Sequence, residues 1–163
     1  MFYCCSSIIN INALQNWNVS NGSNFCVMFD RCKFSDIKPL ENWNVSNGTD
    51  FGGMFCGCES ISDVKPLENW NVSNGTSFCC MFSWCLSLSN IKPLQNWNVS
   101  NGTSFCCMFR ECRSLSDINP LQNWNVSKGN DFACMFHSCS SSLDLKPLEK
   151  WIKINENARK IFD

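Results

Sequence analysis

The sequence has little of what most enzymes and nucleic-acid-binding proteins depend on. It contains a single histidine, His137, and its 13 basic and 14 acidic residues nearly cancel, which leaves a net charge of −1. Because no basic stripe is present to neutralise phosphates, the charge pattern argues against a nucleic-acid partner. A nucleophile elbow, a phosphate-binding glycine loop and an isolated carboxylate pair are missing too. We therefore expect a protein that is not an enzyme and uses no cofactor.

Long hydrophobic runs are also missing. The apolar runs are only a few residues long, such as 79–82 (Cys-Cys-Met-Phe), whereas a membrane-spanning helix needs about 18 or more apolar residues. We therefore expect no membrane span. The first residues lack the charged start, apolar stretch and small-residue cleavage site of a secretory signal, so the chain as it stands is expected to be intracellular. An apolar content of 44% argues against disorder.

The chain does contain an internal repeat. The phrase Asn-Trp-Asn-Val-Ser occurs five times, and each copy is followed by Asn-Gly or Lys-Gly and then by Phe-x-x-Met-Phe-x-x-Cys. A period between about 20 and 50 residues is typical of a solenoid, in which stacked repeats bury a continuous core. The repeat is marked by six tryptophans spaced 26 or 27 residues apart: Trp17, Trp43, Trp70, Trp97, Trp124 and Trp151.

The first half of each repeat has the spacing of a short strand. Leu40, Trp43 and Val45 follow an L-x-x-L-x-L pattern, which in leucine-rich repeats places one strand in each coil with these side chains inside. The alternate residues Asn44 and Ser46 are then expected to face outward.

The second half has helical spacing. Phe51, Met54, Phe55 and Cys58 lie at i, i+3, i+4 and i+7, which predicts one or two helical turns with one buried stripe. The predicted fold is an α/β repeat solenoid, a leucine-rich-repeat-like right-handed coil with one short strand and one short helix per repeat.

The predicted solenoid spans residues 1–151, and a more charged C-terminal cap follows at 152–163. Residues 1–5 align with 81–85, so we expect the array to begin in the middle of a repeat. After this partial first repeat, the repeats lie near 14–40, 40–66, 67–93, 94–120 and 121–147.

The repeats resemble those of the BspA-like leucine-rich repeat surface proteins. The resemblance rests on Trp-Asn-Val-Ser-Asn followed by Met-Phe-x-x-Cys-x-Ser-Leu, and it covers nearly all of residues 1–151. It implies a binding scaffold, often adhesive and at the cell surface, with no catalytic residues. The sequence departs from that pattern in two sets of positions: glycine replaces valine at Gly48, Gly75, Gly102 and Gly129, and phenylalanine replaces methionine at Phe51, Phe78, Phe105 and Phe132.

Fourteen cysteines fall into two main sets. One set holds the same repeat position, so its members are expected to form a buried column with neighbours about 5 Å apart. That spacing allows disulfides, but buried thiols also pack as small hydrophobes, and we expect reduced structural thiols. The column comprises Cys5, Cys32, Cys58, Cys85, Cys112 and Cys139. The second set varies between repeats and comprises Cys26, Cys79, Cys80, Cys106, Cys107 and Cys134.

A metal site is not expected. Cys56 and Cys58 are spaced too tightly for a zinc-binding pair, and His137 is the only histidine. We expect His137 to be an exposed helix residue. The alternative is a nucleophilic pair with Cys134, three residues earlier.

The leading functional hypothesis is a non-catalytic scaffold for protein interaction or adhesion, with a protein as its partner. Positions that differ between repeats are the candidate contacts, and they include an out-of-register tryptophan that is suited to anchor an interface. These candidates are Trp84, Arg31, Arg110, Glu111 and His137.

Two alternatives remain open. The uniform Asn/Ser ladder could bind a periodic ligand such as a polysaccharide, or the chain could be a structural or truncated repeat fragment without its own activity. The ladder comprises Asn44, Ser46, Asn71, Ser73, Asn98 and Ser100.

Overall fold

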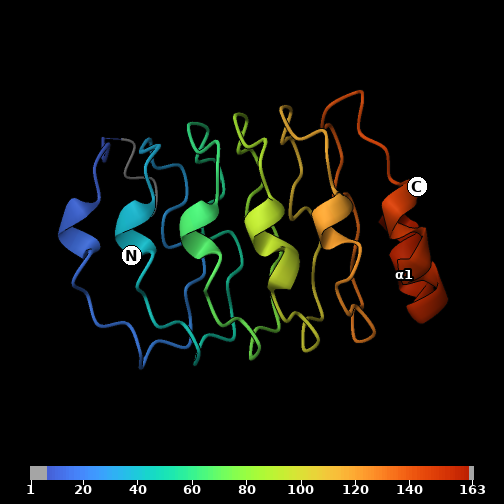
Figure 1. Cartoon of the computed structure of the whole chain (residues 1–163), viewed down its shortest axis with the longest axis horizontal. Helices are drawn as coiled ribbons and strands as arrows, with labels where there is room; N and C mark the ends of the chain where they lie inside the picture. The colour runs from blue at the N-terminus through green and yellow to red at the C-terminus, as the bar shows by residue number, and fades with distance from the viewer. Residues whose placement is uncertain (1–6, 162–163) are drawn as a thin grey trace.

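The computed structural model describes residues 7–161 of the 163-residue chain. The backbone is a row of stacked coils, and the short helices of successive coils lie side by side along the row (Figure 1). The protein is therefore a repeat solenoid. Its helices are η1 (Asn12–Leu14), η2 (Lys38–Leu40), η3 (Lys65–Leu67), η4 (Lys92–Asn96), η5 (Asn119–Leu121), η6 (Lys146–Leu148), α1 (Glu149–Ile154) and η7 (Glu156–Ile161), where η marks a 3-10 helix.

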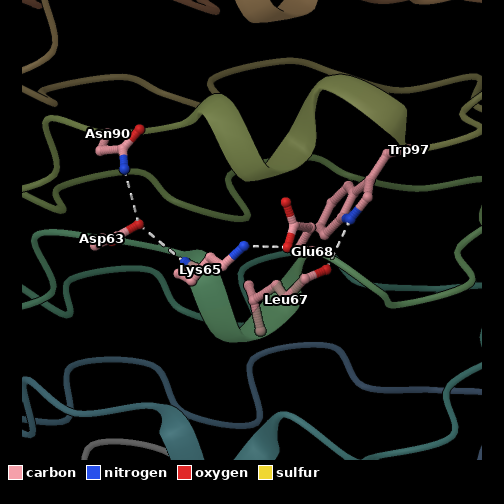
Figure 2. Close-up of polar contacts among 6 residues, drawn as sticks. All are labelled: Asp63, Lys65, Leu67, Glu68, Asn90 and Trp97. Atoms are coloured by element: carbon pink, nitrogen blue, oxygen red, sulfur yellow. Dashed lines mark hydrogen bonds and ion pairs between the residues drawn. The ribbon is translucent and has the colours of Figure 1, made fainter.

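The 3-10 helices η2 to η6 begin where a proline occupies the first helical positions. Proline suits this place because its φ is fixed near helical values and its missing N–H needs no partner. A polar residue just before each helix adds a hydrogen bond. In η3, Asp63 Oδ1 accepts the Lys65 N–H at 2.9 Å and the Asn90 Nδ2 of the next coil at 3.2 Å (Figure 2).

The structure has no regular strand within residues 7–161, so the strand predicted around Trp43 is wrong. Residues 38–40 form η2 instead, and Trp43 lies just after it. Within the described residues, parallel pairing occurs as isolated bridges: one series links Asn24, Asp50, Ser77, Ser104 and Asp131 in turn, and a separate bridge links Asp63 to Asn90. Coil-to-coil pairing thus occurs, but it falls later in the repeat than the L-x-x-L-x-L pattern predicts.

The helix predicted over Phe51–Cys58 is also wrong. The segment consists of turns, in which Met54 N–H donates to Phe51 O while Phe51 N–H donates to Ser77 O of the next coil at 2.9 Å. An α-helix directs its hydrogen bonds within one segment and cannot pair with a neighbouring coil in this way. The buried residues still recur at i, i+3, i+4 and i+7, because two successive four-residue turns produce the same spacing.

The core consists of columns of like residues from successive coils. The tryptophan column is buried from Trp43 to Trp151, and the phenylalanines stack at regular intervals, such as 5.7 Å between the Phe51 and Phe78 rings. Each interior tryptophan also donates Nε1 to a leucine carbonyl of the preceding coil, and Figure 2 shows Trp97 donating to Leu67 O, at 3.0 Å. The column therefore buries large apolar surface while the indole N–H groups of Trp43, Trp70, Trp97 and Trp124 stay paired. Trp151 Nε1, at the end of the column, is buried and has no hydrogen-bond partner among residues 7–161.

The C-terminal end of the row is closed by α1 and η7 (Figure 1), the region of the predicted cap. Trp151 in α1 is fully buried and stacks on Trp124 with ring centroids 6.3 Å apart. Asn155 Nδ2 donates to Val126 O at 2.9 Å, which ties the end of α1 to the last coil. In the part of the chain that the structure describes, no helix has the length and apolar content needed to cross a membrane.

Candidate functional site

The face of the solenoid that varies most between repeats is built from turns. Five segments, 25–32, 51–58, 78–85, 105–112 and 132–139, stack to form what we call the turn ladder. The third residue of each turn has a positive φ, which L-residues other than glycine seldom adopt. These residues are Val27, Arg31, Gly53, Gly57, Cys80, Trp84, Cys107, Glu111, Cys134 and Ser138.

Trp84 is held on the surface by this geometry. Its φ is 61°, its side chain is 41% exposed, and its N–H donates to Arg110 O of the next coil at 2.7 Å. Both neighbours, Ser83 and Cys85, are buried. Trp84 therefore presents an exposed indole ring from a backbone whose two flanking residues are buried.

A groove runs across the turn ladder beside Trp84 and encloses about 800 Å³. Arg31, Trp84 and Arg110, from three different coils, all contribute to its wall. Gly57 lies in the coil between Arg31 and Trp84, and a Cβ there would come within 2.9 Å of Arg31 Cγ. The missing side chain at Gly57 therefore helps to keep the groove open. We refer to this feature as the turn-face groove.

The turn-face groove carries more positive than negative charge. Arg31, Lys33 and Arg110 line it, against one carboxylate, Glu59. Asp30, which is buried, offsets part of the Arg31 charge through an ion pair of 3.7 Å between Nε and Oδ2. Arg110 Nε is buried and has no hydrogen-bond partner among residues 7–161. The groove thus offers cationic donors next to an aromatic ring.

The other two candidates lie outside the turn-face groove. Glu111 is 8% exposed and accepts two hydrogen bonds from Arg113, at 3.0 and 3.1 Å, which lower the pKa of its carboxyl group. The charge of the Glu111 carboxylate is therefore already paired with Arg113. His137 is exposed, but in a turn rather than in the predicted helix. Cys134 is also exposed, and no hydrogen bond joins its side chain to that of His137 in the described chain. The structure brings Arg31, Trp84 and Arg110 together and leaves Glu111 and His137 apart.

The Asn/Ser ladder has a local structural role. Asn44 Oδ1 accepts the Ser46 N–H at 3.1 Å, and the Asn71 and Ser73 pair and the Asn98 and Ser100 pair repeat this bond. Side chains of this kind stabilise turns by such bonds. The contacts along the solenoid axis come from a different set of asparagines: Asn47, Asn74 and Asn101 each donate to a serine carbonyl of the preceding coil.

The predicted cysteine column is present from Cys32 onward, and Cys58, Cys85, Cys112 and Cys139 in it are free thiols; Cys5 lies outside the described residues. Four members donate to a phenylalanine carbonyl of the preceding coil, as Cys85 does to Phe55 O at 3.2 Å. Burial raises the pKa of each of these thiols, and that of Cys139 to about 12. They are therefore protonated structural groups. Across residues 7–161, no group of three or more potential ligands is placed to hold a metal ion.

Sequence reasoning missed three features of this face. Lys33 and Glu59 line the turn-face groove although they fall outside the variable pairs, and only the stacking of coils brings them there. The sequence did contain a signal for the opening at Gly57, because a glycine in a variable pair indicates a turn with positive φ. The third feature is the proximity of Cys79 and Cys106.

Comparisons with known proteins identify the family of this chain. A model of the family described as "Mycoplasma protein of unknown function, DUF285" matches residues 1–116 and 65–163, which together span the chain. The chain belongs to the DUF285 family. A search of curated proteins found no match.

Among solved structures, two internalins of Listeria monocytogenes are similar to this DUF285 protein. InlF is 17% identical with a TM-score of 0.31, over 94% of this chain and 49% of InlF. InlC2 is 18% identical with a TM-score of 0.24, over 74% of this chain and 64% of InlC2. The chain thus spans about half the length of InlF.

Proposed function

We propose that this DUF285 protein is a non-catalytic scaffold that binds another protein through the turn-face groove. The observation that carries the proposal is the meeting of Trp84, Arg31 and Arg110 at one groove of about 800 Å³. Exposed tryptophans and arginines contribute more to interfaces than other residue types. The BspA-like resemblance supports the same proposal, and with it we propose an adhesive role at the cell surface.

The leucine-rich-repeat-like assignment is part of this proposal. The residues of the L-x-x-L-x-L pattern are buried as such a coil requires, with Leu40 at 0%, Trp43 at 4% and Val45 at 1% exposure. Repeats that bury these positions present one extended surface, and binding proteins of this type use that surface.

The groove's charge indicates the kind of protein segment it would bind. Arg31, Lys33 and Arg110 outnumber Glu59, so a segment with carboxylate side chains would be complementary. Arg110 lines the groove and its guanidinium can donate charge-assisted hydrogen bonds to a carboxylate. We therefore expect an extended acidic segment with an apolar side chain that packs on Trp84.

A peptide-display selection against the whole protein tests the proposal. We expect enrichment of acidic peptides whose affinity falls about tenfold or more in Trp84→Ala and in Arg110→Ala. Arg159→Ala is the matched control, because Arg159 is an exposed arginine of η7 that lies outside the groove lining. Selection of peptides that bind equally well to Trp84→Ala and Arg110→Ala would contradict the proposal.

A further inference from the structure

Two cysteines of neighbouring coils lie unusually close together. Cys79 and Cys106 follow Phe78 and Phe105, at the same position of successive repeats, and their Sγ atoms are 2.9 Å apart. Both are free thiols and both are half-buried. A disulfide bond is about 2.05 Å long, so the two sulfur atoms need to approach by less than about 1 Å to form one.

The coil register holds this pair in place. Phe78 N–H donates to Ser104 O at 2.9 Å and Cys80 N–H donates to Cys106 O at 2.8 Å, so backbone bonds flank Cys79 on both sides. The proximity is therefore a property of the folded backbone. In the other coils the same position holds Cys26, Gly52 and Ala133, so no second pair of adjacent coils carries two cysteines there.

Competing thiols are less well placed. Cys80 Sγ lies 3.5 Å from Cys79 Sγ, but a bond between sequence neighbours would close a small ring that strains the planar trans peptide between them. In the buried column, Cys58, Cys85 and Cys112 are fully buried and donate to backbone carbonyls. A dissolved oxidant reaches half-buried thiols more easily than these.

We infer that Cys79 and Cys106 are a thiol pair that forms a disulfide between two neighbouring coils when it meets a small-molecule disulfide. The Cys106 thiolate attacks one sulfur of the small disulfide, breaks its S–S bond and releases one thiolate. The Cys79 thiolate then attacks Cys106 Sγ and releases the second thiolate. The two protons lost by the protein end on the two released thiolates. The protein thiols thus lose two electrons, and the small disulfide is reduced to two thiols.

The geometry assigns the first attack to Cys106. Ser104 Oγ donates a weak hydrogen bond to Cys106 Sγ at 3.7 Å, which favours the Cys106 thiolate. Burial nevertheless raises the pKa of Cys106 to about 12, and contact with Cys80 raises that of Cys79 further. Because the thiolate reacts, the exchange rate should rise about tenfold per pH unit between pH 7 and 9.

Treatment of the folded protein with oxidised glutathione tests the inference. After acid quenching, the intact mass should fall by two hydrogen atoms, and peptide mapping should assign one bridge, between Cys79 and Cys106. Alkylation of Cys58, Cys85 and Cys112 should remain slow, which shows that the solenoid stays folded. A bridge that joins any other pair would overturn the inference, and so would glutathione adducts on both thiols without a bridge.

Three variants sharpen the test. Cys79→Ser should retain one glutathione on Cys106, because the mixed disulfide lacks the thiol that resolves it. Cys106→Ser should form no bridge between the coils. Cys26→Ser is the matched control, since Cys26 holds the equivalent position beside Gly52, and it should react like the unaltered protein. If a variant does not fold, the disulfide mapped in the unaltered protein still shows whether Cys79 and Cys106 form the bridge.

Discussion

Two faces of the same coil use their residues differently. On the tryptophan side, the phrase Asn-Trp-Asn-Val-Ser recurs almost unchanged, and its polar atoms hydrogen-bond within the stack. On the turn ladder, the apolar residues recur but the outward residues change from coil to coil, among them Arg31, Gly57 and Trp84. The stack requires the first set of residues and tolerates change in the second. Uniform positions therefore build this solenoid, and variable positions are available for recognition.

The largest expected contrast lies between two tryptophans. Trp97 is 4% exposed and bonded to Leu67 O, so Trp97→Ala should lower the free energy of unfolding by about 3 to 5 kcal/mol. Trp84 is 41% exposed, so Trp84→Ala should lower it by less than about 1 kcal/mol. Urea unfolding of both variants checks this. Equal losses of unfolding free energy in the two variants would mean that Trp97 is not an interior residue and Trp84 is not a surface residue.

The buried cysteine column predicts a dependence of stability on pH. Burial raises the pKa of Cys139 from its ordinary value of 9.0 to about 12, and it raises those of Cys58, Cys85 and Cys112 as well. Thiols of the unfolded chain ionise at lower pH than those of the folded chain. This contribution to stability is therefore complete below pH 9.0 and is lost as the pH rises toward about 12.

Thermal unfolding between pH 7 and 11 measures that dependence. We expect the melting temperature to fall above pH 9.0, and to fall less steeply in Cys85→Ala, which removes one titrating thiol. An identical slope in Cys85→Ala and the unaltered protein would show that the column thiols do not cause the dependence.

On the turn ladder, Gly57→Ala should affect both stability and the turn-face groove. Gly57 has a φ of 69°, and the new Cβ would meet Arg31 Cγ at 2.9 Å. We expect a loss of about 1 to 2 kcal/mol in urea unfolding, together with weaker binding of a selected peptide. Gly53→Ala is the matched control, because Gly53 has a φ of 60° but does not line the groove, so it should weaken the fold and leave binding unchanged.

The smallest expected effect has the opposite sign. Val27 is a β-branched residue at a φ of 47°, and it is 37% exposed. Val27→Gly should relieve this strain at little cost in buried surface and raise the free energy of unfolding by about 0.5 to 1 kcal/mol. A measured loss of stability would show that the Val27 side chain contributes more by packing than its backbone conformation costs.

The sequence predicted the inward residues better than the elements that carry them. Leu40, Trp43 and Val45 are buried as their spacing indicates, and so are Phe51 and Cys58. The element type was wrong because successive four-residue turns and a helix give the same spacing. The hydrogen bonds that distinguish them run to a coil about 26 residues away, as from Phe51 N–H to Ser77 O, and local sequence does not reveal such partners.

The candidate site was predictable only in part, for the same reason. Variation between repeats pointed to Trp84, Arg31 and Arg110, which line one groove. It also pointed to Glu111 and His137, which do not line it, because variation alone does not show which outward residues face one hollow. Lys33, Glu59 and the Cys79 and Cys106 pair depend on the register between coils, which appears only in three dimensions.

One comparison of affinities tests most directly whether the variable face is the recognition face. A selected acidic peptide would be titrated against Trp84→Ala/Arg110→Ala and against Asn71→Ala/Asn98→Ala, two double variants with one change in each of the same two repeats. We predict that the first loses about a hundredfold or more in affinity and that the second stays within about threefold of the unaltered protein. Loss of binding in the asparagine variant alone would contradict this account and assign recognition to the Asn/Ser ladder.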